Sequence, residues 1–278
     1  MSGFAVTPLT RVLGARIDGV DLSAALDDAT VASIRAALLD HKVLFFRKQS
    51  LDAASQAGVA ARFGTLTPAH PVEPAVEGHP EILSLDSQDG ARADVWHTDL
   101  TFQAEPPLGA MLHAVVVPEV GGDTIWVDMA AAYDALSPTL QRFLDGLQAA
   151  HVASKAGGYF AARDTTDDKA AAAATAAAAP AHHPVVRVHP ETGRRSLFVN
   201  PLFTDRIDGL HRVESDALLA LLYDVATRPE HQLRWHWEPG DVAFWDNRCT
   251  MHYALLDYGS ERRRMERVAL AGDRPVGP

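Results

Sequence analysis

The sequence predicts an α+β chain built around an antiparallel barrel or jelly roll, with helices packed outside it. Helical patterns occur early and in the middle of the chain, whereas many short strand patterns follow residue 90. The 278 residues are 47% hydrophobic, which supplies enough apolar material for one sizeable core. We find no internal repeat. We therefore expect residues 1–278 to form a single domain.

The first part of the chain predicts a hairpin, two helices and one buried strand. Residues 10–22 alternate apolar and polar side chains around two glycines, which is typical of a short hairpin. Residues 29–40 are expected to form a helix with one apolar face, and residues 43–46 are a continuous apolar run that predicts a buried strand. A second helix is expected over residues 52–63, with Asp52 as its N-cap.

Beyond residue 90 the chain predicts strands joined by short turns. Residues 121–123, Gly-Gly-Asp, are expected to be the turn between the first two strands. Strands are expected over residues 112–117, 124–127, 185–188, 196–199, 232–237, 242–245 and 267–271, and helices over residues 130–133, 137–147 and 215–226.

An alanine-rich stretch interrupts this pattern. Residues 170–181 are almost entirely alanine, lack the polar face of a stable surface helix, and follow a soluble polar stretch. We expect residues 157–181 to form a mobile insertion between strands. Two interpretations stay open, a passive linker and a lid over an active site.

Composition excludes several classes of partner. The net charge is −11 and the isoelectric point about 5.6, which argues against nucleic acid and against an anionic membrane surface. The one cysteine, Cys249, excludes an intrachain disulfide, fits a cytoplasmic location, and is expected to be a small buried hydrophobe. Neither a secretory signal nor an apolar run of about 20 residues is present, so no membrane span is expected.

His97 and Asp99 are the first candidate metal ligands. Side chains two residues apart on an extended segment project to the same side, so both can reach one ion. His252, far later in the chain, is the best candidate for a third ligand. Two imidazoles and one carboxylate on one face of an octahedron suit Fe(II) enzymes that bind a chelating co-substrate and O₂.

Arg263 follows His252 by eleven residues and identifies the co-substrate that we expect. 2-Oxoglutarate chelates iron at one end, and its far carboxylate needs a buried cationic fork such as a guanidinium. Arg262, Arg263 and Arg264 are consecutive, so a solvated basic run is the alternative. On a strand, however, Arg263 would face the opposite side from its two neighbours.

Motifs of one known family extend over nearly the whole chain. They lie at residues 41–47, 62–64, 96–102, 106–107, 121–124, 183–187, 245–248, 252–254, 257–258 and 263–272. By these motifs the chain resembles the taurine/2-oxoglutarate dioxygenase (TauD/TfdA) family, which also includes alkylsulfatases and aryloxyalkanoate dioxygenases. The resemblance implies a double-stranded β-helix, that is, a jelly-roll core with flanking helices, and a homodimer or homotetramer.

The resemblance also implies a role for each candidate site residue. The residues that match the iron ligands are His97, Asp99 and His252, and those that match the 2-oxoglutarate contacts are Thr124 and Arg263. His70 and Arg267 match the residues that hold the substrate anion. Without the family, Thr124 would be an ordinary strand residue, His70 a loop histidine and Arg267 a surface arginine.

Two departures from the taurine enzymes bear on the substrate. Glu73 stands where those enzymes carry a tyrosine, and Ala93 where they carry an asparagine. A bulkier sulfonate, an alkyl sulfate ester or an aryloxy carboxylate therefore fits better than taurine.

The resemblance thus predicts an Fe(II)- and 2-oxoglutarate-dependent dioxygenase that acts on a small anionic organic substrate. It would hydroxylate the carbon next to the anionic or leaving group of a sulfonate or alkyl sulfate ester. The products would be succinate, CO₂ and a cleaved aldehyde or ketone. One alternative is the same chemistry on an aryloxyalkanoate, and a remote alternative is a non-catalytic jelly-roll protein that binds a metal or anion.

Overall fold

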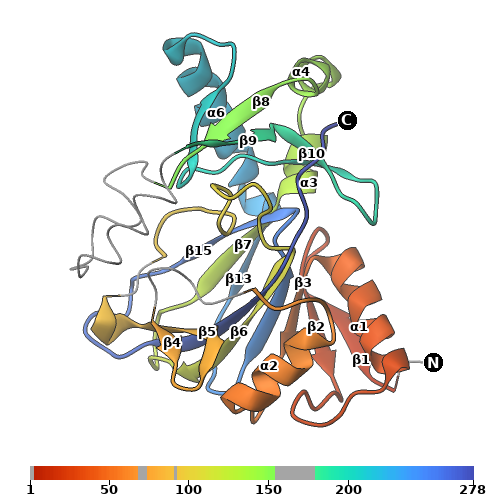
Figure 1. The fold of residues 1–278 in the computed structure, drawn as a ribbon, viewed down its shortest axis with the longest axis vertical. Helices are drawn as coiled ribbons and strands as arrows, with labels where there is room; N and C mark the ends of the chain where they lie inside the picture. Colours follow the sequence, from red (N-terminus) through yellow and green to blue (C-terminus); the bar gives the residue numbers. More distant parts are fainter. Residues whose placement is uncertain (1–2, 68–73, 91–92, 154–178) are drawn as a thin grey trace.

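The computed structural model describes residues 3–67, 74–90, 93–153 and 179–278 (Figure 1). Its centre is a pair of facing sheets. The larger sheet has the strand order β1 (Ala5–Pro8), β2 (Ala15–Asp18), β3 (Val43–Phe46), β14 (Val242–Asp246), β6 (Gly109–Val116), β16 (Arg264–Leu270), β5 (His79–Asp86) and β4 (Ala75–Val76). The smaller sheet has the order β13 (Gln232–Trp235), β7 (Thr124–Asp128) and β15 (Thr250–Ala254).

Aromatic side chains fill the space between the two sheets. Phe45 of the larger sheet stacks on Trp235 of the smaller one at 4.1 Å between ring centroids, and Trp245 packs on Trp126 at 6.0 Å. Both Trp126 and Trp245 are fully buried. This arrangement confirms the predicted α+β jelly roll.

Two helices cover the outer face of the larger sheet (Figure 1). α1 (Asp28–His41) begins at the N-cap Asp27, and α2 (Ala53–Ala61) begins, as predicted, at the N-cap Asp52. β3 lies between these helices and the inter-sheet core, so Leu44 and Phe46 face the helices while Val43 and Phe45 face inward. Burial on both faces explains why this strand is a continuous apolar run.

A second layer covers the outer face of the smaller sheet, in the upper part of Figure 1. Its core joins Val127 of β7 and Met251 of β15 to Leu222 on the longest helix of the layer. The layer contains the helices α3 (Met129–Asp134), α4 (Pro138–Leu144) and α6 (Arg212–Ala226), the sheet β12 (Thr204–Ile207), β8 (Gln148–His151) and β9 (Ala181–Pro184), and the pair β10 (Val186–Val188) and β11 (Arg195–Leu197). In the part of the chain that the structure describes, the short 3₁₀ turns are η1 (Ser87–Asp89) and η3 (Pro229–His231).

Several expected elements differ from the structure. The hairpin expected over residues 10–22 is shifted, because β1 and β2 pair across residues 9–14. The expected turn at residues 121–123 crosses from the larger sheet to the smaller one, since β6 and β7 lie in different sheets. The strands β4, β5, β8, β9, β12 and β15 are not predicted from the sequence. Of the expected insertion at 157–181, residues 157–178 lie outside the described residues.

Among the described residues, no helix combines the length and apolar character that a membrane span requires.

Candidate metal centre and co-substrate site

Backbone pairing brings the first and last candidate ligands together. His97 and His252 form an isolated antiparallel bridge, in which each backbone N–H donates to the other's carbonyl oxygen at 3.0 and 2.8 Å. Asp99 follows two residues later, and its Oδ1 lies 3.7 Å from His97 Nε2 and 3.9 Å from His252 Nε2. One ligand atom from each of the three side chains lies within 4.8 Å of the other two.

Burial and charge set the protonation of this triad. Burial lowers the pKa of His97 below its usual value, and burial together with the neighbouring His97 lowers the pKa of His252 further. Burial alone would raise the pKa of Asp99, but Arg267 and the two histidines hold it below its usual value. Neutral imidazoles and an ionised carboxylate are the forms that bind a metal.

The three side chains fit a divalent iron ion. His97 Nδ1 lies 2.7 Å from the carbonyl oxygen of Val95. A carbonyl can only accept, so this contact places the proton on Nδ1 and leaves the Nε2 lone pair for a metal. Asp99 Oδ2 is buried with no hydrogen-bond partner among the described residues, as expected of an oxygen that binds a cation. Two histidines and one carboxylate are the donor set that suits Fe(II).

Arg267 lies at the edge of the triad. It projects from the inner face of β16, and its Nη1 donates to Asp99 Oδ1 at 2.6 Å. Its side chain is buried, and its Nε has no hydrogen-bond partner among the described residues. His70, the other predicted substrate contact, lies outside the described residues, as does Glu73.

Arg263 and Thr124 meet beside the triad. Arg263 Nη2 donates to Thr124 Oγ1 at 3.2 Å, and Arg263 Nε donates to the carbonyl oxygen of Gly122 at 2.9 Å. Thr124 pairs with Ala254 in the β7–β15 register, and the same register places Trp126 opposite His252. Thr124 therefore lies opposite the residue two positions after His252, on the same face of the sheet as that histidine.

The geometry contradicts the alternative of a solvated basic run for Arg263. Arg262 pairs with Asp86 and Arg264 with Glu266, each at 2.6–2.7 Å, while Arg263 turns toward Thr124. Burial lowers the pKa of Arg263 to about 10, so its guanidinium keeps its charge at neutral pH.

A second group of potential ligands, His189, Asp246 and Cys249, is an ion-pair network. Arg248 donates to both carboxylate oxygens of Asp246, at 2.9 and 2.6 Å, and His189 Nε2 lies 3.0 Å from the second of these oxygens. These contacts occupy both oxygens of the Asp246 carboxylate, which a metal ion would need as ligands. Burial raises the pKa of the Cys249 thiol, which makes it an inert buried side chain, as predicted.

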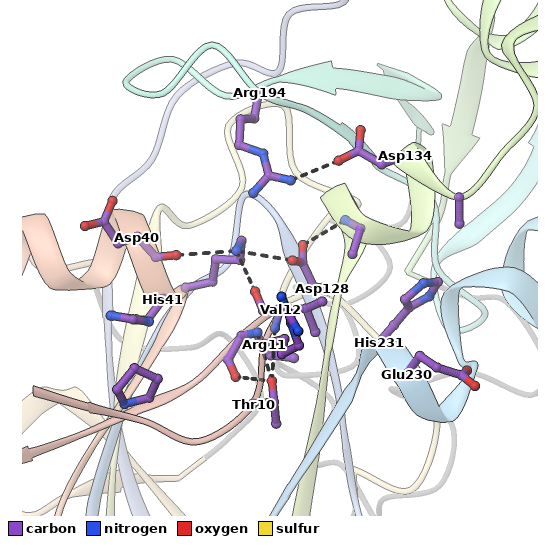
Figure 2. Close-up of a pocket in the computed structure, with 15 residues that line it drawn as sticks. Thr10, Arg11, Val12, Asp40, His41, Asp128, Asp134, Arg194, Glu230 and His231 are labelled. Atoms are coloured by element: carbon purple, nitrogen blue, oxygen red, sulfur yellow. Dashed lines mark hydrogen bonds and ion pairs between the residues drawn. The ribbon is translucent and has the colours of Figure 1, made fainter.

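A cavity of about 880 Å³ lies at the other end of β7 (Figure 2). Asp128, the last residue of β7, lines it together with Lys42. Lys42 Nζ lies 3.2 Å from Asp128 and donates to the carbonyl oxygen of Val12 at 2.7 Å. None of the predicted site residues that the structure describes lines this cavity. It is separate from the candidate metal centre.

Comparison with known proteins agrees with this geometry. Residues 5–269 match the family model described as taurine catabolism dioxygenase TauD, TfdA family. An α-ketoglutarate-dependent sulfate ester dioxygenase of Pseudomonas putida is 45% identical over 98% of this chain and 91% of its own. An alkylsulfatase of Acinetobacter baylyi is 41% identical over 97% of this chain and 85% of its own. The crystal structure of a taurine dioxygenase from Burkholderia xenovorans superposes with a TM-score of 0.85 and 41% identity, covering 99% of this chain and 93% of that one.

The family match extends over most of the chain and includes the histidine–aspartate–histidine triad. It sets aside the alternative of a non-catalytic jelly-roll protein. The chain belongs to the TauD, TfdA dioxygenase family, and it is an Fe(II)- and 2-oxoglutarate-dependent dioxygenase.

Proposed function

We propose that this dioxygenase oxidises a small organic sulfate ester or sulfonate at the carbon that bears the anionic group. The observation that carries the proposal is the buried guanidinium of Arg267, which lies against Asp99 and keeps one N–H without a partner among the described residues. A buried donor without a partner costs about 1–3 kcal/mol. An oxyanion of the substrate would supply that partner. The names of the sulfate ester dioxygenase and the alkylsulfatase support this class of substrate.

We propose that His97, Asp99 and His252 hold the iron, and that Thr124 and Arg263 hold the far carboxylate of 2-oxoglutarate. With 2-oxoglutarate and O₂, the bound Fe(II) supplies the oxidising power for hydroxylation of the substrate. The protein's part is to position the reactants and to exclude water. Trp245 helps to exclude water, since it is buried and its ring centroid lies 5.0 Å from that of His252.

We propose Arg267 as the residue that orients the substrate anion, with His70 as its partner. Hydroxylation next to a sulfate or sulfonate gives a product that collapses to an aldehyde or ketone and releases the leaving group. Ala93 supports a substrate larger than taurine, because its methyl group leaves more room than the asparagine of the taurine enzymes.

We further propose that residues 1–278 are one catalytic domain that works in the cytoplasm as a homodimer or homotetramer, with no nucleic-acid or membrane partner. The single cysteine supports the cytoplasmic location. The net charge of −11 argues against a face that binds the phosphates of nucleic acid or lipid. Light scattering coupled to size-exclusion chromatography would measure the oligomeric state directly.

A substrate panel tests the proposed function. The Fe(II)-loaded enzyme is given 2-oxoglutarate with an alkyl sulfate, an alkanesulfonate, taurine or a phenoxypropionate, and succinate is measured together with sulfate, sulfite or phenol. We expect the fastest matched release with the alkyl sulfate. Faster phenol release would favour the aryloxyalkanoate alternative. A flat response to every anion would refute the role of Arg267.

A pair of arginine variants refines this test. Arg267→Gln is expected to raise KM for the alkyl sulfate by about tenfold or more, because a charged hydrogen bond contributes about 1.5–3 kcal/mol. Arg264→Gln, on the same strand but paired with Glu266, is the matched control and is expected to leave that KM unchanged.

A further inference from the structure

Asn247 makes a two-point contact with the backbone of the candidate ligand Asp99. Its Oδ1 accepts from the N–H of Asp99 at 2.9 Å, and its Nδ2 donates to the carbonyl oxygen of Asp99 at 3.1 Å. The same Nδ2 donates to the carbonyl oxygen of Pro107, also at 3.1 Å. The Asn247 side chain is 1% exposed, so these contacts are shielded from water.

Asp99 needs such a partner because the chain turns sharply after it. Leu100 has a φ of +52°, a left-handed conformation that leucine rarely adopts. The pairing that begins at His97 therefore stops, and in the described structure no strand pairs with Asp99. A buried backbone N–H and C=O must still be satisfied. The amide of Asn247 satisfies both.

The turn that carries Asn247 is itself held firmly. The N–H of Asn247 donates to the carbonyl oxygen of Leu108 at 2.9 Å. On either side, Asp246 and Arg248 pair with each other, and Arg248 also pairs with Glu191 at 2.7 Å. Asn247 therefore links the backbone of Asp99 to the β14–β15 turn, whose own position is fixed by these hydrogen bonds and ion pairs.

We propose that Asn247 is a positioning residue that sets the Asp99 carboxylate for metal binding. The inference rests on the proposed role of Asp99 as an iron ligand. Asn247 contacts the backbone of Asp99, and among the described residues its side-chain hydrogen bonds reach neither His97 nor His252. Its effect is therefore expected on metal affinity, through the placement of one carboxylate.

Asn247→Asp and Asn247→Ser test this role. The aspartate keeps the shape but replaces the donor with an acceptor that faces two carbonyl oxygens, while the serine is too short for both contacts and adds no charge. The affinity of the metal-free protein for Mn(II) is measured by calorimetry, and stability is measured by thermal unfolding with EDTA. We expect the affinity for Mn(II) to fall by about 10- to 100-fold in both variants.

Gln49→Glu is the matched control. Gln49 makes the same pattern of contacts elsewhere, accepting from the N–H of Leu22 at 2.8 Å and donating to the carbonyl oxygens of Arg47 and Val20 at 2.8 and 3.2 Å. The control is expected to lower the unfolding temperature and leave Mn(II) affinity unchanged. The positioning role is overturned if the folded Asn247→Ser variant binds Mn(II) as tightly as the parent while its stability falls.

Asp99→Ala separates this inference from the proposed function. If Asp99→Ala keeps parental Mn(II) affinity, the ligand role of Asp99 fails, and the positioning role fails with it. If Asp99→Ala loses affinity and both Asn247 variants keep it, only the positioning role fails.

Discussion

Thr124 shows how single contacts prepare the site for an anion. Its hydroxyl oxygen accepts from Arg263 Nη2 at 3.2 Å and from Trp237 Nε1 at 3.0 Å. A hydroxyl oxygen has two lone pairs, and these two donors occupy both. The hydroxyl proton is therefore left to donate, and a carboxylate beside Arg263 is a suitable acceptor. Donor and cation together support the proposed contact with the far carboxylate of 2-oxoglutarate.

Replacement of Thr124 by valine should weaken 2-oxoglutarate binding. The methyl group keeps the shape of the strand residue but removes the donor, and it leaves Trp237 Nε1 without its partner. We expect KM for 2-oxoglutarate to rise about tenfold, which corresponds to about 1.4 kcal/mol. Steady-state kinetics at saturating substrate checks this. Thr124→Ser keeps the hydroxyl and should stay close to the parent, so an equal effect in both variants would contradict this role of the hydroxyl.

At the scale of the element, β9 holds the loop that follows the candidate ligands. His183 of β9 lies with its Nε2 2.8 Å from the carbonyl oxygen of Thr101 and 3.0 Å from that of Gln103. Two carbonyl acceptors require a proton on Nε2. Burial lowers the pKa of His183 from 6.5 to about 4, so the ring is neutral at pH 7.

This depressed pKa predicts a dependence of stability on pH. Between pH 6.5 and about 4 the unfolded chain binds a proton at His183 and the folded chain does not. The contribution of the neutral His183 ring to the free energy of unfolding is therefore complete above pH 6.5. It is lost as the pH falls, by up to about 1.4 kcal/mol per pH unit. Urea unfolding at pH 7 and pH 5 measures the slope. His183→Gln has no titrating ring and should lose less stability over this range, whereas an unchanged slope would exclude His183 as its source.

The close approach of β6 and β14 depends on Gly109. A Cβ on Gly109 would lie 2.4 Å from the carbonyl oxygen of Trp245, which is backbone and cannot move aside. We expect Gly109→Ala to lower the free energy of unfolding by about 1–3 kcal/mol. Gly146, whose added Cβ would meet nothing within 4 Å, is the control. Gly146→Ala should change stability by no more than about 0.5 kcal/mol in the same denaturant titration.

At the scale of the whole molecule, metal binding should stabilise the fold. A ligand that binds only the folded chain at 100 times its Kd adds about 2.7 kcal/mol. For a protein of this size we expect Mn(II) to raise Tm by roughly 5–10 °C above the value in EDTA. Differential scanning calorimetry measures the shift. Asp99→Ala should show little of it, and a full shift in that variant would place the metal elsewhere.

Much of the fold follows from apolar pattern, and two of the missed strands, β8 and β9, lack one. β3 was predicted with its observed bounds because burial on both faces makes Val43–Phe46 continuously apolar. β8 and β9 read Gln-Ala-Ala-His and Ala-His-His-Pro, which contain no β-branched residue and no alternation. They are strands because they pair with each other, and β8 also pairs with β12 on its other side. The sequence of one segment alone does not indicate that it pairs with distant segments.

The site could be predicted to the extent that it uses side chains. Residue type and spacing predict His97, Asp99 and His252, and the distance to His252 predicts Arg263. Asn247 lies within a family motif, but its part is played through hydrogen bonds to backbone atoms of Asp99. Backbone groups are the same in every sequence, so only the structure brings that contact into view.

The bridge between His97 and His252 has a consequence for the order of biosynthesis. More than half of the chain separates these two histidines, so a nascent polypeptide cannot complete the centre until β15 has left the ribosome. Closing so long a loop costs entropy, which burial of the apolar faces of the two sheets offsets. A small zinc-finger domain differs, because there the metal itself supplies the free energy of folding. A chain truncated before β15 would be unable to assemble the three-residue centre.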